Sequence, residues 1–283
     1  MHWKTTLAGS GGSVPALSER FNKPGMSGRW SDLYLRAASA LVLGPLALFC
    51  LWWGGTAWDL LIGVAMAGLG HEWARLAGLR YTWPLSGIML LVWAAAMLLG
   101  ISAGLQAVVF LGLAAWPVYG RFAAAGVPYA GLAGVCLIWL RQRHEVGLED
   151  TAFLILVVWG TDIGAYIVGR LFGGVKLAPR ISPGKTWSGA LGGLALGGAC
   201  GAGLAATHGA PAYAFGAGVL LSFVAQAGDL LESAIKRKLG VKDSGRTIPG
   251  HGGLFDRLDG FLTAAPMAAL LAASMHGGVG LWG

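Results

Sequence analysis

The chain has 283 residues, of which 55% are apolar and only 12% are charged. A soluble globular domain carries about 25% charged residues, so this composition excludes an ordinary soluble protein. The chain also contains 48 glycines and 13 tryptophans. Membrane helices tolerate glycine, and tryptophan gathers at membrane interfaces. The composition therefore predicts an all-α polytopic membrane protein.

The formal net charge of +7 raises the question of nucleic-acid binding. The basic residues lie in loops between apolar runs rather than on one amphipathic face, which favours membrane topology as their explanation. Cys50, Cys136 and Cys200 each lie alone in an apolar run, so we expect packing residues rather than metal ligands or disulfide partners. We expect no nucleic-acid partner.

The apolar runs give the number of membrane crossings, because a hydrocarbon core about 30 Å thick requires roughly 20 helical residues. After a flexible cytoplasmic tail at residues 1–30, about nine transmembrane helices are predicted, with the third and fourth divided near Gly100. The predicted spans are 33–54, 58–77, 84–100, 102–119, 127–140, 151–172, 187–207, 211–235 and 259–280.

The positive-inside rule orients these spans. With the N-terminus in the cytoplasm and the C-terminus outside, all basic residues except Arg141 and Arg143 fall on the cytoplasmic side. Two polar loops, 173–186 and 236–258, fall on that side together. We expect N-terminal transmembrane helices over 31–150 and a catalytic transmembrane region over 151–283.

Acidic residues inside or at the ends of the spans are candidates for function, because a charged side chain in a span costs about 2.5–3.5 kcal/mol on insertion scales. Asp162 lies in the sixth span, Asp229 and Glu232 end the eighth, and Asp256 and Asp259 border the ninth. Each of the last two pairs is three residues apart and so shares a helix face. Mg²⁺ prefers such hard oxygen ligands. The pattern predicts a magnesium site, and the alternative is a set of structural ion pairs with Arg170, Lys236, Arg237 or Arg257.

The loop over 236–258 combines positive charge with glycine, which suits phosphate binding. Its lysines and arginines supply positive potential, and glycines such as Gly252 and Gly253 allow close approach of backbone N–H groups to an anion. For His251 we favour a phosphate contact or an ordering role in the loop, with proton transfer as the alternative.

The loop over 173–186 ends in Ser182-Pro-Gly-Lys185-Thr186. We expect its polar side chains either to donate to phosphate oxygens or to form a helix N-cap turn with an interfacial lysine. The letters GKT do not make a P-loop, because the upstream glycine and strand are missing.

Two further features concern the helices themselves. Glu72, late in the second span, is expected to form an interfacial ion pair with Arg75, with an accessory polar role as the alternative. Glycines at four-residue intervals in the seventh span predict a close helix-packing face. They are Gly189, Gly193, Gly197 and Gly201.

The stretch from Ser233 to Asp259 resembles the signature of the phosphatidate cytidylyltransferases, also called CDP-diacylglycerol synthases. It reads Ser233-Ala-Ile-Lys236-Arg237, then Lys242-Asp243-Ser-Gly, then Ile-Pro-Gly-His251-Gly252-Gly253-Leu-Phe-Asp256-Arg257-Leu-Asp259. Asp162-Ile-Gly-Ala-Tyr and Gly-Asp229-Leu-Leu-Glu232-Ser resemble further segments of the family. Ser182-Pro-Gly-Lys185-Thr186-Trp resembles another segment but departs from it at Gly184 and Ser188, whose effect on phosphate binding the resemblance leaves open.

The resemblance implies that CTP and phosphatidate give CDP-diacylglycerol and pyrophosphate with Mg²⁺, and that a second cation, K⁺, takes part. It implies metal ligation by Asp229 and Asp256, joined in our hypothesis by Asp162 and Glu232. The expected catalytic residues are Asp229, Asp256, Lys242 and Asp259. The expected substrate-binding residues are Ser182, Lys185, Thr186, Lys236, Arg237, Asp243, His251, Gly252, Gly253 and Arg257. We expect a bacterial inner membrane location with the site facing the cytoplasm, and a homodimer stays open.

Two other functions are weighed against this one. A CTP-dependent lipid kinase would release CDP instead of pyrophosphate, and the signature over 233–259 argues against it. A cation transporter or channel would use Asp162 and Asp229 as ion sites but would not need the basic, glycine-rich loop. The spaced motif of the CDP-alcohol phosphotransferases is not found.

Overall fold

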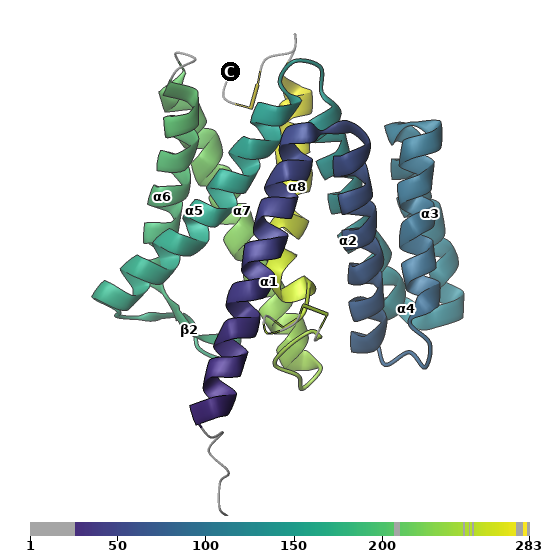
Figure 1. Ribbon diagram of the computed structural model, residues 1–283, viewed down its shortest axis with the longest axis horizontal. Helices are drawn as coiled ribbons and strands as arrows, with labels where there is room; N and C mark the ends of the chain where they lie inside the picture. The colour runs from purple at the N-terminus through teal and green to yellow at the C-terminus, as the bar shows by residue number, and fades with distance from the viewer. Residues whose placement is uncertain are drawn as a thin grey trace, which may run out of the picture.

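The computed structural model describes residues 26–206, 210–245, 247–248, 250, 252–275 and 280–281. Eight helices fill most of this part of the chain, and one small antiparallel hairpin interrupts them (Figure 1). The helices are α1 (Met26–Trp53), α2 (Gly55–Leu76), α3 (Trp83–Leu99), α4 (Ile101–Gln142), α5 (Gly147–Phe172), α6 (Trp187–Ala205), α7 (Pro211–Lys238) and α8 (Phe255–Ser274). The strands are β1 (Lys176–Ala178) and β2 (Ser182–Thr186).

Glycines with positive φ mark two of the helix boundaries. Gly100, at φ 96°, separates α3 from α4, as the sequence predicts. Gly120, at φ 84° and ψ 165°, is not helical and divides α4 into two helical segments. A side chain is strained at such φ values, whereas glycine adopts them freely. α1 begins at Met26, so the predicted tail is wrong for residues 26–30, which are helical.

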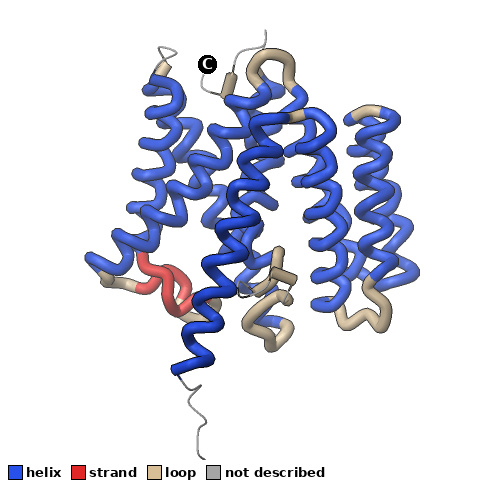
Figure 2. The backbone as a smooth tube through the Cα atoms, viewed as in Figure 1, coloured by secondary structure: helices blue, strands red, loops and turns tan. Residues whose placement is uncertain are grey.

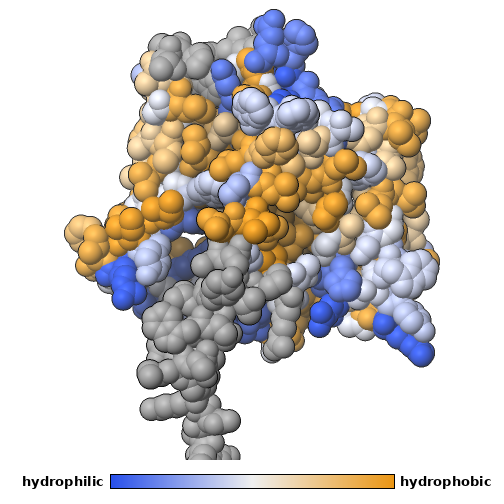
Figure 3. All heavy atoms as spheres, viewed as in Figure 1, coloured by the Kyte–Doolittle hydropathy of each residue, from blue (hydrophilic) through white to orange (hydrophobic). Residues whose placement is uncertain are grey.

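The apolar content of the helices agrees with a membrane protein. Among the helices of the described residues, four, α4 to α7, are long and apolar enough to cross a bilayer. Large apolar side chains such as Val64, Leu98, Phe110 and Leu171 are exposed on the outer surface. Figure 3 shows an apolar band on one face of the molecule with hydrophilic residues at both ends. The chain is an all-α membrane protein with a small hairpin.

Arg141 and Arg143, which do not follow the positive-inside pattern, have structural partners. Arg141 donates from Nε to the Leu51 carbonyl oxygen at 2.8 Å, at the C-terminal end of α1. The last carbonyls of a helix lack partners within the helix, and a cation there also meets the negative end of the helix dipole. Arg143 forms an ion pair with the buried Asp150. Local structure therefore accounts for both basic residues.

The prediction of a close packing face on α6 is confirmed. A Cβ atom added at Gly189 would lie 2.8 Å from the Ala165 carbonyl oxygen of α5. One added at Gly197 would lie 2.6 Å from Thr161 Oγ1 and 2.9 Å from Ser222 Cβ. The Thr161 hydroxyl also donates to Ser222 Oγ at 2.7 Å, which joins α5 to α7 beside Gly197. Glycine therefore lets α5, α6 and α7 pack closely at Thr161 and Ser222.

Gly197→Ala is expected to destabilise the protein by about 1–3 kcal/mol, the range for an overpacked core. The added methyl group has no room between Thr161 and Ser222. The midpoint of unfolding in detergent measures the effect. Gly203→Ala is the matched control in the same helix, because a Cβ atom there has no neighbour within 4 Å. Equal midpoints for the two variants would contradict the packing argument.

Candidate active site

Acidic side chains from α7 and α8 converge at one place. Asp229, Glu232 and Asp259 each supply a carboxylate oxygen, and these oxygens lie within 4.8 Å of one another. The two helices approach closely at Gly228, where an added Cβ atom would lie 2.9 Å from the Asp259 carbonyl oxygen. The i, i+3 spacing of Asp229 and Glu232 places both on the face of α7 toward α8. These three residues are called the acidic cluster below.

The hairpin brings a lysine to this cluster. Lys185, on β2, forms an ion pair with Asp229. Arg237, at the end of α7, donates from Nε to the Ile181 carbonyl oxygen at 3.2 Å and so fixes the hairpin against α7. The two polar loops therefore lie at the same end of the bundle, as predicted (Figure 2). Asp162 on α5 interacts electrostatically with Asp229 and Lys185.

Asp256 lies beside the cluster, and its carboxylate is taken up by other groups. Lys236 Nζ lies 2.7 Å from Asp256 Oδ1 and 2.9 Å from Glu232 Oε2, so it bridges the two acids. The backbone N–H groups of Ser244 and Gly253 each donate to Asp256 at 3.1 Å. Asp256 precedes the predicted ninth span. Burial raises the pKa of its carboxyl group, but the hydrogen bond from Lys236 and smaller contributions bring the pKa below its usual value.

The acidic cluster has the donor chemistry that a divalent cation requires. Glu232 is only 1% exposed, and its Oε1 has no hydrogen-bond partner in the described part of the chain. A buried polar atom without a partner is costly, and a bound cation would satisfy it. Carboxylate oxygens are the hard ligands that Mg²⁺ prefers. The residues present therefore fit Mg²⁺, with Glu232, Asp229 and Asp259 as the side chains able to hold it.

Glu72 corrects one expectation. It does not form the expected ion pair at an interface but is fully buried and accepts three hydrogen bonds from distant residues. The donors are the Ser244 hydroxyl at 3.0 Å, the Leu254 N–H at 2.7 Å and the Phe255 N–H at 2.8 Å. A contact between residues about 180 positions apart cannot be seen in local sequence spacing.

The predicted substrate residues occupy several environments. Thr186 is buried and accepts from the Gly189 N–H at 3.1 Å as the N-cap of α6, which supports the N-cap alternative for its hydroxyl. Lys242 and Asp243 are exposed in the loop after α7, and Arg257 is exposed on α8. Ser182 and Gly252 are partly buried, and His251 lies outside the described residues. Their contacts with substrate stay predictions.

Two residues near the site, Ser244 and Tyr129, were not predicted from the sequence. Ser244 links Glu72 to Asp256 through its hydroxyl and its backbone N–H. Tyr129, on α4, has a buried hydroxyl without a hydrogen-bond partner in the described part of the chain. Its ring packs against Phe255, at the start of α8, with ring centroids 5.6 Å apart. One tyrosine in an apolar span gives only a weak signal, whereas the charge of Glu72 in a span was a signal that could have been followed further.

An apolar groove of about 380 Å³ lies between α1, α2, α4, α5 and α8. Trp58 and Met66 of α2 line it together with Leu137 of α4. Leu254, directly before α8, and Arg257, in its first turn, line it as well. The groove therefore extends to the loop whose backbone N–H groups bind Asp256. This cavity is called the apolar groove below.

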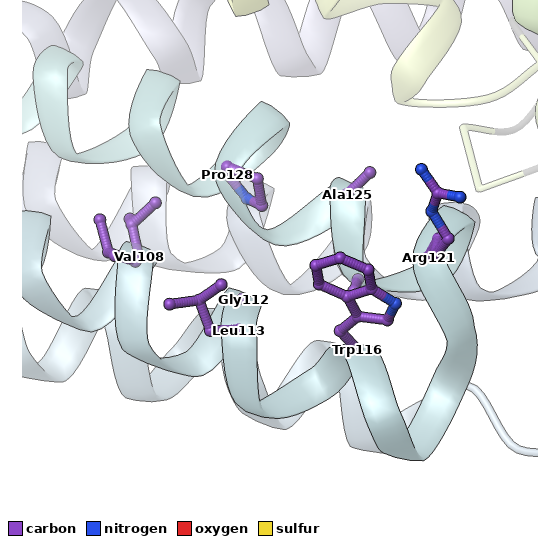
Figure 4. A pocket seen from close by; sticks show the side chains of 9 residues that line it. Val108, Gly112, Leu113, Trp116, Arg121, Ala125 and Pro128 are labelled. Atoms are coloured by element: carbon purple, nitrogen blue, oxygen red, sulfur yellow. The ribbon is translucent and has the colours of Figure 1, made fainter.

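A second cavity, of about 440 Å³, lies in the bend of α4 (Figure 4). Its lining comes from the two segments of α4 on either side of Gly120, including Leu113, Ala125 and Pro128. Arg121 lies over the ring of Trp116, 5.8 Å from its centroid. None of the residues that line this cavity is acidic, so it offers no cation site.

Comparison with known proteins decides the family. Residues 34–275 match the cytidylyltransferase family. The chain belongs to this family. The predicted resemblance is confirmed, and so is the prediction of a nucleotidyltransferase.

Individual relatives support the assignment. The phosphatidate cytidylyltransferase of Brucella suis is 42% identical over 260 residues, which covers 86% of this chain and 94% of the relative. That of Pseudomonas aeruginosa is 37% identical and covers 86% of this chain and 98% of the relative. That of Mycobacterium leprae is 44% identical over 155 residues, or 52% of this chain and 46% of the relative. The first two relatives match this member of the cytidylyltransferase family over nearly their whole length.

Proposed function

We propose that this chain transfers a cytidylyl group from CTP to phosphatidate and so forms CDP-diacylglycerol. A phosphate oxygen of phosphatidate attacks the α-phosphorus of CTP. The bond from the α-phosphorus to the oxygen that bridges the α- and β-phosphates breaks, and pyrophosphate leaves. Phosphatidate already carries a nucleophilic oxygen at neutral pH, so no covalent enzyme intermediate is needed. The protein must position two anions and offset their repulsion.

The single observation that carries this proposal is the placement of acidic and basic side chains from α7, α8 and the hairpin at one end of a helical bundle. Asp229, Glu232 and Asp259 lie within reach of one cation, and Lys185 and Lys236 pair with the same acids. When phosphates enter, these lysines can exchange a carboxylate partner for a phosphate oxygen. Bound Mg²⁺ would supply the positive charge that offsets the phosphates and the acids. Asp162 would take part in holding a second cation, K⁺.

The membrane orientation belongs to the same proposal. We infer nine crossings, with α4 counted twice because of its break at Gly120. α1 begins at the end of the bundle that carries the hairpin, and α8 ends at the opposite end, as an odd number of crossings requires (Figure 1). The site would then face the cytoplasm at the inner membrane of a bacterium, where CTP is available.

A product assay with purified protein tests the proposal. With CTP, phosphatidate and Mg²⁺, we expect release of pyrophosphate and formation of a lipid that carries cytidine. Release of CDP with a lipid alcohol would instead indicate a CTP-dependent lipid kinase. Chelation of Mg²⁺ is expected to stop pyrophosphate release, and full activity in a chelator would contradict the metal assignment.

We further propose that the apolar groove holds an acyl chain of phosphatidate. Its lining is apolar along α2 and α4, and Arg257 at its site end offers a cation for the lipid phosphate. An acyl chain placed there would leave its headgroup beside the loop that holds Asp256. This arrangement would explain why a deep apolar groove reaches a charged site.

Ala65→Phe, in the lining of the apolar groove, is expected to raise KM for long-chain phosphatidate about tenfold, because the ring fills space that the acyl chain needs. A short-chain phosphatidate should be affected much less. Ala125→Phe, in the bend of α4, is the matched control, because it fills a cavity that no acidic residue lines. An equal rise in KM for both chain lengths would contradict the proposal.

A further inference from the structure

Glu72 lies outside the acidic cluster, and residues distant in the chain bind its carboxylate. It lies near the end of α2, has no exposed surface and receives three hydrogen bonds. Two of the donors, the backbone N–H groups of Leu254 and Phe255, belong to the N-terminal end of α8. These groups have no partner within the helix, and a carboxylate there is also favoured by the helix dipole. Glu72 therefore caps α8 from another helix.

Glu72 and Asp256 hold the same loop at two neighbouring points. Ser244 donates its hydroxyl to Glu72 at 3.0 Å and its backbone N–H to Asp256 at 3.1 Å. On the other side of the loop, the Gly253 N–H donates to Asp256 at 3.1 Å and the next N–H, of Leu254, donates to Glu72 at 2.7 Å. The two carboxylates thus join the start and the end of the loop between Ser244 and Leu254.

The space around the Glu72 carboxylate is closed by backbone. A Cβ atom added at Gly245 would lie 2.8 Å from Glu72 Oε1, and one added at Gly253 would lie 2.7 Å from Glu72 Oε2. The adjacent Trp73 packs against Phe255, with ring centroids 5.4 Å apart, and against Tyr129 at 5.7 Å. The backbone at Gly245 and Gly253 therefore encloses the Glu72 carboxylate closely.

We propose that Glu72 is a positioning residue for the reaction, which acts by fixing the loop so that Asp256 holds Lys236 against Glu232. The inference rests on the proposed function. Its chain of contacts runs from Glu72 through Ser244 to Asp256 and then through Lys236 to the acidic cluster. A carboxylate is required because all three partners donate. Glutamine has one acceptor oxygen, and its NH₂ group would face an N–H donor.

The test compares Glu72→Gln with Asp59→Asn. Asp59 is a buried acid of the same helix that accepts from Gln142 at 3.2 Å, and it takes no part in the site. Glu72→Gln is expected to lower kcat for pyrophosphate release about 10–100-fold and to raise the Mg²⁺ concentration that gives half-maximal rate, as loss of a supporting partner does. Hydrogen exchange at the Leu254 and Phe255 amides should accelerate in Glu72→Gln only.

The measurements answer two separate questions: whether Glu72 holds the loop, and whether the held loop positions the site. Unchanged exchange at both amides would overturn the role of Glu72 in holding the loop, whether or not the enzyme is active. Faster exchange with a normal kcat and normal Mg²⁺ requirement would show that the held loop does not position the site. Absence of pyrophosphate release from the unaltered protein would instead overturn the proposed function, and hydrogen exchange would still decide whether Glu72 holds the loop.

Discussion

Asp259→Asn is expected to lower kcat for pyrophosphate release about 10²–10³-fold, the range for removing one preorganised electrostatic group. Asp259 contributes one of the three carboxylate oxygens that lie within 4.8 Å of one another. Its only hydrogen bond among the described contacts comes from the adjacent Gly260 N–H at 2.8 Å, so it anchors no other segment. The loss should therefore fall on cation binding rather than on folding.

Thermal unfolding separates these two effects. A cation that binds only the folded state stabilises it by about 2.7 kcal/mol when the free cation concentration is 100 times Kd. Mg²⁺ should therefore raise Tm of the unaltered protein. In Asp259→Asn, this rise should disappear, while Tm without Mg²⁺ should not fall. Glu145→Gln, which removes an exposed acid outside the cluster, should keep both the rise and the activity. A normal Mg²⁺ response in Asp259→Asn would contradict the assignment.

Asp256→Asn is expected to lower kcat by about 100-fold and also to destabilise the loop. Asp256 accepts from the Lys236 ammonium at 2.7 Å and from two backbone N–H groups, and the NH₂ group of asparagine would face one of these donors. The loss of a hydrogen bond to a charged group costs about 1.5–3 kcal/mol. Asp256→Asn should thus lose both activity and stability, whereas Asp259→Asn should lose activity alone.

The same two measurements, kcat with its Mg²⁺ dependence and the midpoint of unfolding, examine Asp256→Asn. Lys242→Gln serves for comparison, since Lys242 is exposed and its loss should weaken phosphate binding without changing the midpoint. If Asp256→Asn kept normal turnover and normal Mg²⁺ dependence, Asp256 would have no part in the site.

Much of the architecture follows from local sequence. The apolar runs determine helices because a membrane-spanning backbone must satisfy its own hydrogen bonds. Gly100 marks a boundary between α3 and α4, and the apolar stretch over 84–119 is too long for one crossing and so already requires a boundary. The four-residue glycine spacing of α6 predicts its packing face, because residues four apart share one side of a helix. The break at Gly120 lies between two predicted spans and needs no distant contact.

The candidate site was predictable as a set of residues but not as a set of contacts. The spacing of Asp229 and Glu232 places them on one face, and the positive-inside rule brings the two polar loops to one side. Asp256 and Asp259 share a similar spacing, yet only Asp259 joins the acidic cluster, while Asp256 pairs with Lys236. The difference depends on where α7 and the loop lie against α8, which no spacing within α8 contains.

Sequence by itself determined the membrane class, most of the helical segments, the family and the acidic and basic candidates for the site. Only the tertiary structure decided which carboxylates gather, that Lys185 reaches Asp229, and that Glu72 caps α8. The physical reason is the range of the interactions. Helix formation and burial in lipid depend on residues that are neighbours in the chain. The hydrogen bonds of a carboxylate depend instead on which donors lie within about 3 Å of it, and the packing of distant helices determines this.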